Sequence, residues 1–214
     1  MNPLELQQNT EEWLKYKCGR LGGSSIADML TRTKTGWGAG RLNLKARLVA
    51  ERLTGCPTES YKSKAMEYGT ETEAEACNVY GFMRDVDPVA VGYVDHPTIE
   101  WAGCSPDRLI GEDGLIQVKC PNTATHISSL LGGSVDGGYF KQMQWEMACT
   151  GRQWCDYVTY DKRLPPEMQL HVTRITRDHV MIANLEQEAM IFLKEVDETV
   201  QALRERYQVL EAAE

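Results

Sequence analysis

Three polar residues in the middle of the chain have the types and spacing of a metal site. In the segment SPDRLIGEDGLIQVKC, residues 105 to 120, Asp107 stands ten residues before Gln117, and Lys119 follows two residues later. Because a Gly-containing turn separates them, a hairpin would bring the carboxylate beside Gln117 and Lys119, which strand alternation places on one face. A carboxylate, an amide oxygen and the backbone carbonyl of Val118 can hold a hard cation such as Mg²⁺, with the ammonium beside a bound water. Metal-assisted hydrolysis of a phosphodiester requires this chemistry.

Alternation also separates polar from apolar side chains in this segment. Ile116, Val118 and Cys120 fall on the face opposite Gln117 and Lys119, as expected of a strand with one buried side. The spacing alone is weak evidence, because a lysine on an exposed strand edge and an aspartate in a turn would produce the same pattern.

Charge is unevenly distributed along the chain. The net charge is -8, yet residues 15 to 64 carry eleven Lys and Arg against three Asp and Glu, a local balance of +8. This basic segment predicts either a surface that binds a polyanion, on a protein whose remaining surface is acidic, or a solvated helix face.

Composition limits the class of protein. The chain has 214 residues, 42% hydrophobic and 25% charged, which is typical of a globular protein and excludes disordered, coiled-coil and collagen-like classes. We expect no membrane span and no secretory signal, because the apolar runs are short and the N-terminus lacks a basic start. The seven cysteines form no CxxC pair, which argues against a zinc or disulfide framework and favours the reducing cytosol.

The elements that must position these residues follow from periodicity. Short β-type runs are expected over 89 to 119 as a meander with a hairpin turn, followed by strands over 153 to 161 and 168 to 175. Helices are expected after the capping residue Ser24 or Ser25 and over 11 to 17, 42 to 53, 65 to 82, 125 to 131 and 139 to 149. A long final helix carries an apolar stripe formed by Ile182, Leu185, Ala189, Phe192, Val196, Val200, Leu203, Tyr207 and Leu210. This order predicts one α/β or α+β domain with helices on both faces of a sheet.

A set of motifs in a fixed order resembles the PD-(D/E)xK nucleases, and among them the lambda exonuclease or YqaJ-type viral recombinase branch. The motifs run from residue 13 to residue 144 and comprise Trp13-x3-Lys17, Gly19-Arg-Leu-Gly-Gly-Ser24, Gly69-Thr-Glu-Thr-Glu73, Cys104-Ser-Pro-Asp107, Gln117-Val-Lys-Cys-Pro121, Gly132-Gly133 and Gln142-Met-Gln144. The resemblance implies an α/β single domain over residues 1 to 214, with a restriction-endonuclease-like core in which helices flank a central mixed sheet.

The resemblance also implies an activity. Such enzymes are Mg²⁺-dependent deoxyribonucleases, with one or two ions and Mn²⁺ as a substitute, that bind the end of double-stranded DNA. They digest one strand from 5′ to 3′ and leave a 3′ single strand for recombination with a single-strand annealing protein. The family further implies a homotrimer, a ring in which the basic segment would line the DNA channel, in the cytoplasm of a bacterium or of a phage-infected host.

The family's site residues can be placed on this chain one at a time. Asp107 and Glu73 would be metal ligands and catalytic carboxylates, although Glu73 lies in a run of glutamates that could equally be a solvated helix face. Gln117 and the Val118 carbonyl would complete the metal site, and Lys119 would orient or activate the attacking water.

Further positions would contact DNA. The terminal 5′-phosphate would be received by Lys17, where the family commonly has Arg, together with Ser24 and Ser105. Gln142 and Gln144 would line the active site or lie on a helix surface. Met66 would be either an apolar wedge at the duplex end or a core residue. Basic-segment residues expected to contact DNA are Arg20 and Lys34.

Gln117 departs from the family pattern, which has Glu or Asp at this position. Either the chain uses a variant site, or a carboxylate has been replaced; we favour replacement and expect a chain that binds DNA and cuts poorly. A non-catalytic DNA-end binding protein is an alternative that Gln117→Glu with Mg²⁺ would test. A structure-specific or restriction-type endonuclease is another, because the core motif does not encode exonuclease or endonuclease action.

Overall fold

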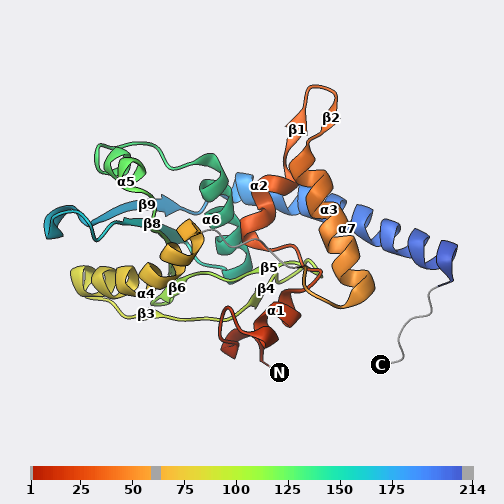
Figure 1. Ribbon diagram of the computed structural model, residues 1–214, viewed down its shortest axis with the longest axis horizontal. Coiled ribbons are helices and arrows are strands. Elements are labelled where there is room, and N and C mark those ends of the chain that lie inside the picture. Colours follow the sequence, from red (N-terminus) through yellow and green to blue (C-terminus); the bar gives the residue numbers. More distant parts are fainter. Residues whose placement is uncertain (1, 59–63, 209–214) are drawn as a thin grey trace.

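The computed structural model describes residues 2 to 58 and 64 to 208 (Figure 1). Its centre is a five-stranded sheet in the order β3-β6-β7-β8-β9, in which β7 and β8 are parallel and the other neighbours are antiparallel. These strands are β3 (Pro88–Val89), β6 (Arg108–Ile110), β7 (Gly114–Lys119), β8 (Trp154–Tyr160) and β9 (Leu170–Thr176). The mixed sheet confirms the predicted α/β fold.

Helices cover both faces of this sheet, and Figure 1 shows α4 along one side and α6 on the other. The helices of the described residues are α1 (Glu11–Lys17), α2 (Ile26–Met29), α3 (Ala39–Thr54), α4 (Lys64–Arg84), α5 (Thr123–Leu130), α6 (Gly137–Thr150) and α7 (His179–Tyr207). Each corresponds to a helix predicted from the sequence, with ends shifted by a few residues.

Alternate residues of β7 face different helices. Ile116 and Val118 are buried in one core cluster with Ala76 of α4. Leu115, on the opposite face, is buried in another cluster with Met143 of α6. The face of β7 that carries Gln117 and Lys119 therefore lies toward α6, and the predicted alternation is confirmed.

A third core cluster joins α2, α3, α6 and α7 beside the sheet. Trp145 of α6 is fully buried in it, and its indole Nε1 donates to the carbonyl oxygen of Gly103 at 3.0 Å. The stripe of α7 from Leu185 to Val200 is buried in the same cluster, and the partly buried Leu203 packs against it, whereas Ile182 belongs to the cluster of Leu115 and Met143. Tyr207 is 67% exposed, so the last predicted stripe position of the described helix does not pack, and Leu210 lies outside the described residues.

Two small antiparallel sheets stand beside the main one. The hairpin of β1 (Arg32–Thr33) and β2 (Gly36–Trp37) projects from the body of the molecule (Figure 1) and was not expected from the sequence. The second sheet pairs β4 (Val94–Asp95) with β5 (Gly103–Cys104).

The predicted meander is wrong at its start, because the run over residues 89 to 94 is not one strand. β3 ends at Val89, and the following backbone pairs with the N-terminal segment. Gly92 N donates to the Leu4 carbonyl at 2.9 Å, and Tyr93 N donates to the Pro3 carbonyl at 2.8 Å. The chain can then continue into β4, in a different sheet.

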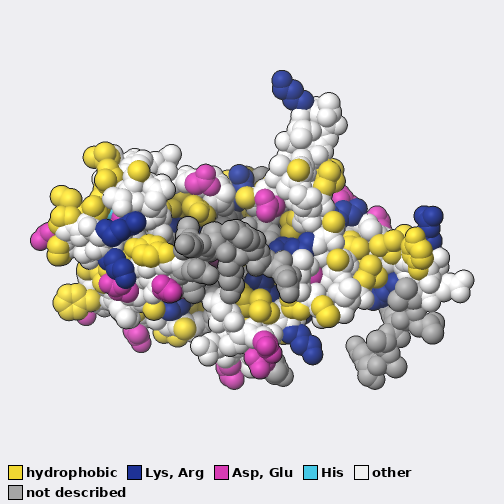
Figure 2. All heavy atoms as spheres, in the orientation of Figure 1, with side chains coloured by type: hydrophobic (Ala, Val, Ile, Leu, Met, Phe, Trp, Pro, Cys, Tyr) yellow, Lys and Arg dark blue, Asp and Glu magenta, His cyan; other side chains and the backbone are white. Residues whose placement is uncertain are grey.

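The surface carries mixed charge, and Figure 2 shows acidic, basic and apolar side chains interspersed over the visible face. Within the described residues, none of the helices has both the length and the apolar character needed to cross a membrane.

Glycine at the start of β7 allows a close approach to the neighbouring strand. A Cβ on Gly114 would lie 2.2 Å from carbon atoms of the Trp154 indole. The same ring is also covered by Arg174, whose guanidinium carbon lies 3.7 Å from the ring centroid. The ring has little room to shift, so glycine is required where β7 begins.

We therefore expect Gly114→Ala to lower the free energy of unfolding by about 1–3 kcal/mol through overpacking. Gly22→Ala is the control, because Gly22 has a φ of -94° and a Cβ added to it would meet no atom within 4 Å. It should change stability by less than about 0.5 kcal/mol. Urea denaturation of both variants measures the difference, and equal stabilities would contradict the close packing of Gly114.

Candidate functional site

The antiparallel pairing of β6 with β7 sets the geometry around Asp107. Arg108 is the register partner of Ile116, so Asp107, directly before β6, faces the end of β7. Its Oδ2 accepts hydrogen bonds from Val118 N at 2.6 Å and from Gln117 Nε2 at 2.7 Å. The hairpin thus brings the carboxylate to the polar residues of β7, as the spacing predicts.

Helix α6 adds two more polar side chains to this group. Gln142 donates from Nε2 to Gln117 Oε1 at 3.0 Å and to Glu146 Oε1 at 2.8 Å. Gln142 and Glu146 lie four residues apart and so share a helix face. Two amides therefore connect the carboxylate of Asp107 to that of Glu146, which the sequence did not single out.

Glu73 approaches from α4, on the other side of Asp107. Its Oε1 lies 3.6 Å from Arg108 Nη1, and its side chain is about one-third exposed. Burial and the charge of Asp107 together raise the pKa of Glu73 to about 7, whereas Arg108 and Lys119 act in the opposite direction. The carboxyls of Glu73 and Asp107 are thus close enough to repel each other.

Glu146 is under the same influences. Burial raises its pKa to about 8, and Asp107 contributes in the same direction, while the Gln142 hydrogen bond and Lys119 lower it. The pKa of Asp107 is also raised by burial, against the effects of Lys119 and of the Val118 N–H. Lys119 acts on all three carboxyl groups, and its Nζ lies 5.0 Å from the centroid of the Tyr139 ring.

These residues suit a hard cation by their chemistry. Among the residues that the structure describes, no three His, Cys, Asp or Glu side chains are gathered around one point as ready metal ligands. However, the carboxylates of Asp107, Glu73 and Glu146 and the amide oxygen of Gln117 offer oxygen ligands, which Mg²⁺ prefers. Glu146 Oε2 is buried and has no hydrogen-bond partner among the described residues. A divalent ion would relieve the repulsion between carboxylates and supply that partner.

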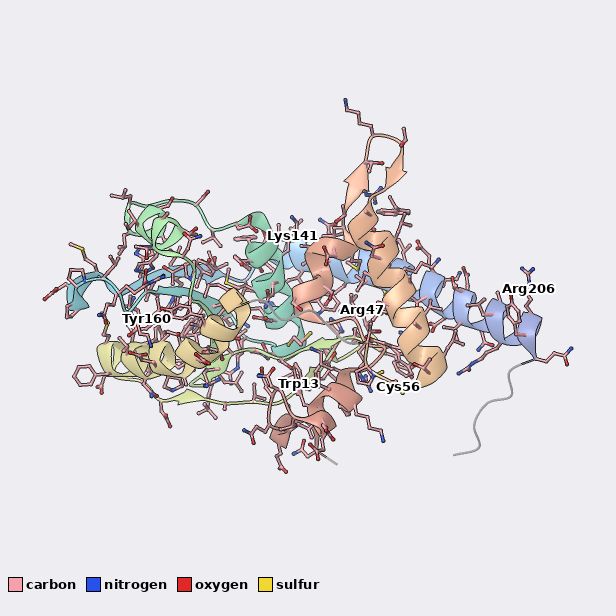
Figure 3. The ribbon with its side chains drawn as sticks, viewed as in Figure 1. Trp13, Arg47, Cys56, Lys141, Tyr160 and Arg206 are labelled. Atoms are coloured by element: carbon pink, nitrogen blue, oxygen red, sulfur yellow. The ribbon has the colours of Figure 1, made fainter. Side chains whose placement is uncertain are left out.

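A second cluster, on α1, α3 and the adjoining turns, is basic. Lys17 Nζ lies 3.9 Å from the centroid of the Trp13 ring, and Trp13 Nε1 donates to Ser105 Oγ at 3.0 Å. Arg47 Nη2 donates to Ser25 Oγ at 3.0 Å. Burial lowers the pKa of Lys17 to about 8, with Arg47 adding to the effect. Two cations and two hydroxyls therefore gather here, and Figure 3 labels Trp13 and Arg47 on their two helices.

The turn between these clusters packs against α6. A Cβ on Gly23 would be in ordinary contact with Glu146 Cγ at 3.5 Å and with Gln142 Cγ at 3.6 Å. Gly23 begins the 3-10 turn Gly23–Ser25. The basic cluster and the carboxylate cluster are thus neighbours that share this turn.

One predicted site residue needs correction, and another stays untested. Gln144 is fully buried away from Asp107, because its Nε2 donates to the Thr176 carbonyl and its Oε1 accepts from Asp178 N, both at 2.8 Å. It lies two residues after Gln142 and hence on the opposite side of the helix. Ser24 is exposed, and its contact with the 5′-phosphate stays a prediction; its neighbour Ser25 accepts from Arg47.

The remaining predicted DNA contacts are Arg20, Lys34 and Met66. Arg20 Nη1 pairs with Asp95 Oδ1 at 3.2 Å, and its guanidinium carbon lies 4.6 Å from the Tyr16 ring centroid. Lys34 is exposed at the turn of the β1–β2 hairpin, where Figure 2 shows a basic side chain at the tip. Met66 lies in the first turn of α4, but its side chain is outside the described part of the structure.

Sequence reasoning missed Glu146, Arg47 and Ser25. Glu146 could have been found from its spacing, because it follows Gln142 by one helical turn. Arg47 lies within the basic segment and on the predicted helix over 42 to 53, but nothing local distinguished it from its neighbours.

Comparison with known proteins places the fold in a class. Residues 12 to 153 match the YqaJ-like viral recombinase domain. The crystal structure of LHK-Exo in complex with dAMP is 45% identical in sequence, with a TM-score of 0.86, over 93% of this chain and 98% of that one. The structure of the alkaline exonuclease LHK-Exo from Laribacter hongkongensis is 44% identical, with the same TM-score and coverage.

A more distant structure has the same fold. The phage related exonuclease from Haemophilus somnus 129PT is 15% identical, with a TM-score of 0.66, over 86% of this chain and 96% of that one. No curated protein matches the chain.

The protein therefore has a lambda-exonuclease-type fold and falls in a nuclease family. More narrowly, the chain belongs to the YqaJ-like viral recombinase family.

The electrostatic coupling of the three carboxyl groups can be tested in the metal-free protein. We expect Asp107→Asn to lower the pKa of both Glu73 and Glu146, because it removes a negative charge that raises them. Both pKa values should stay above 4.5, because burial, the larger cause, remains.

Carboxyl ¹³C NMR titration measures these values. The control is Asp161, whose pKa is held at about 2 by its hydrogen bonds with Arg163 and Thr123, against burial, and which should not change. Unchanged titration of Glu73 and Glu146 would show that Asp107 is too distant to act on them.

Proposed function

We propose that this protein is a Mg²⁺-dependent exonuclease that digests one strand of double-stranded DNA from its 5′ end. The observation that carries the proposal is the Asp107 carboxylate held against Gln117 and Val118 N, with the Lys17 cluster beside it. The family membership supports this activity. The relative LHK-Exo has been crystallised with dAMP, a deoxynucleotide, which supports DNA as the substrate.

The carboxylate cluster would carry the hydrolysis. Asp107, Glu73, the Gln117 amide oxygen and the Val118 carbonyl would hold the cation. Bound Mg²⁺ supplies Lewis-acid polarisation of the phosphodiester and lowers the pKa of water, and Mn²⁺ is expected to replace it. Lys119 would orient the attacking water through Nζ, since its charge acts on the same carboxyl groups.

The basic cluster would select the end of the strand. Lys17 and Arg47 can neutralise a phosphate, and the hydroxyls of Ser25 and Ser105 can donate to its oxygens. A terminal phosphate is more highly charged than an internal diester, so this cluster supports exonuclease rather than endonuclease action. The same property predicts that a closed circular duplex is not digested.

Gln117 bears on the rate of cleavage. A neutral amide contributes one oxygen and no charge, so cation binding would be weaker than with the acidic residue of the family pattern. The chain then cuts poorly unless another carboxylate supplies the missing charge.

The biological setting follows from the family. We propose that the 3′ single strand is passed to a single-strand annealing protein for recombination in the cytoplasm of a bacterial host. We also propose a homotrimer around the DNA, in which the basic segment faces the duplex. Native mass spectrometry would test the trimer.

Replacing Asp107 should separate cleavage from binding. We expect Asp107→Ala to reduce cleavage by more than about 100-fold, because even outer-shell partners of a metal cost about 10–100-fold when removed. Binding of a 5′-phosphorylated duplex end should persist, since the basic cluster is intact. Asp113→Ala is the control, because this exposed carboxylate lies in the turn between β6 and β7. Undiminished cleavage by Asp107→Ala would refute the site.

Replacing Lys17 should remove the preference for a 5′-phosphate. The lost charge-assisted hydrogen bond is worth about 1.5–3 kcal/mol, so Lys17→Ala should cut phosphorylated ends about 10–100-fold more slowly. Ends bearing a 5′-hydroxyl should be cut at an unchanged rate, and Lys17→Arg should keep the preference.

The matched control is Lys15→Ala, which changes an exposed lysine of the same helix. It should behave as the unaltered protein. If Lys17→Ala still prefers phosphorylated ends, the phosphate is bound elsewhere.

A further inference from the structure

One buried carboxylate, that of Glu146, has no role in the proposed function described above. Glu146 is 1% exposed on α6. Its Oε1 accepts from Gln142, whereas its Oε2 is buried with no partner among the described residues. Leaving a buried acceptor unpaired is costly, and leaving a charged one unpaired costs more. The unpaired oxygen therefore indicates that a partner beyond the described residues completes this group.

The surroundings of Glu146 do not provide that partner. No ion pair joins it to a Lys or Arg among the described residues. Gly23, which packs against its side chain, offers no side chain of its own. Lys119 acts on Glu146 through its charge without a direct contact.

Hydrogen bonds through the Gln142 amide connect Glu146 to the candidate metal residues. Glu146 Oε1 and Gln117 Oε1 both accept from the Gln142 amide nitrogen, at 2.8 and 3.0 Å. Gln117 in turn donates to Asp107 at 2.7 Å. The carboxylates of Asp107 and Glu146 are thus joined through the side chains of Gln117 and Gln142 in one polar network.

We propose that Glu146 is an acidic metal ligand of this site, and that it supplies from α6 the negative charge that Gln117 does not supply from β7. The proposal rests on the proposed function, because it assigns a further ligand to the same cation. The site then has three carboxylates, those of Asp107, Glu73 and Glu146, around the ammonium of Lys119.

This assignment gives Gln117 a working role. Its amide nitrogen is a donor, so it can bind Asp107 Oδ2 at a place where a second carboxylate would repel that oxygen. The neutral Gln117 on β7 and the acidic Glu146 on α6 then complement each other in one site. The chain has a variant site rather than a disabled one, the alternative that the sequence alone did not favour.

The test is Mn²⁺ binding by isothermal titration calorimetry, without DNA and at a pH above 8. We expect Glu146→Gln to weaken Mn²⁺ binding at least about 10-fold, because loss of even an outer-shell partner of a metal ligand lowers metal affinity by about 10–100-fold. Adding Gln117→Glu to Glu146→Gln should recover most of the affinity, because it returns a carboxylate to the same network. Glu75→Gln, at an exposed glutamate of α4 paired with Lys162, should bind as the unaltered protein does.

Each other outcome has a distinct meaning. Unchanged Mn²⁺ affinity in Glu146→Gln would overturn the proposal and leave Glu146 as a buried neutral acid. If Gln117→Glu does not recover the Mn²⁺ affinity lost in Glu146→Gln, the proposal that Glu146 supplies the charge missing at position 117 is overturned. If the unaltered protein bound no Mn²⁺ and cut no DNA, the proposed function itself would fail, together with this inference.

A second measurement does not depend on how the variants fold. In unaltered protein labelled with ¹³C, Mn²⁺ should broaden the carboxyl signal of Glu146 strongly and that of Glu75 weakly. Equal broadening of the two signals would overturn the proposal.

Discussion

The pairing of one carboxylate with one strand organises this site. Asp107 Oδ2 accepts from the backbone of Val118 and from the side chain of Gln117, so the end of β6 is fixed against the end of β7. The backbone bond depends only on the strand register, whereas the amide bond depends on the residue type at position 117. The side chains of α4 and α6 therefore pack around a carboxylate whose position is set by the sheet.

The cost of this arrangement is electrostatic. Three acidic groups lie close together with one lysine, and burial raises the pKa of Glu73, Asp107 and Glu146. Groups whose folded-state pKa is raised favour the native state below their unfolded values, near pH 4.5, and that contribution is lost as pH rises through about 7 to 8. The metal-free protein therefore gives up stability at neutral and alkaline pH, and a bound cation would return it.

The sequence predicted what local pattern controls. The contact of Asp107 with Gln117 follows from a short hairpin and strand alternation, and the helices follow from periodicity and caps. The break after Val89 could not be predicted, because it depends on pairing of Gly92 with the distant Leu4. Glu146 was missed for a related reason, since its place opposite β7 arises from the packing of α6 against the sheet. Gln144 was misplaced because a two-residue step turns a helical side chain to the opposite side.

The turn at Gly23 links the carboxylate cluster with the basic cluster. Its backbone lies against Gln142 and Glu146, and two residues later Ser25 contacts Arg47. If a ligand bound at one cluster displaces this turn, the space available at the other cluster changes. Any such coupling is reciprocal: if an occupied anion pocket tightens the cation site, an occupied cation site tightens the anion pocket by the same factor. A DNA end without a 5′-phosphate would then leave the anion pocket empty, and the protein would bind its cation more weakly. The presence of the 5′-phosphate and the affinity for the metal would therefore be coupled.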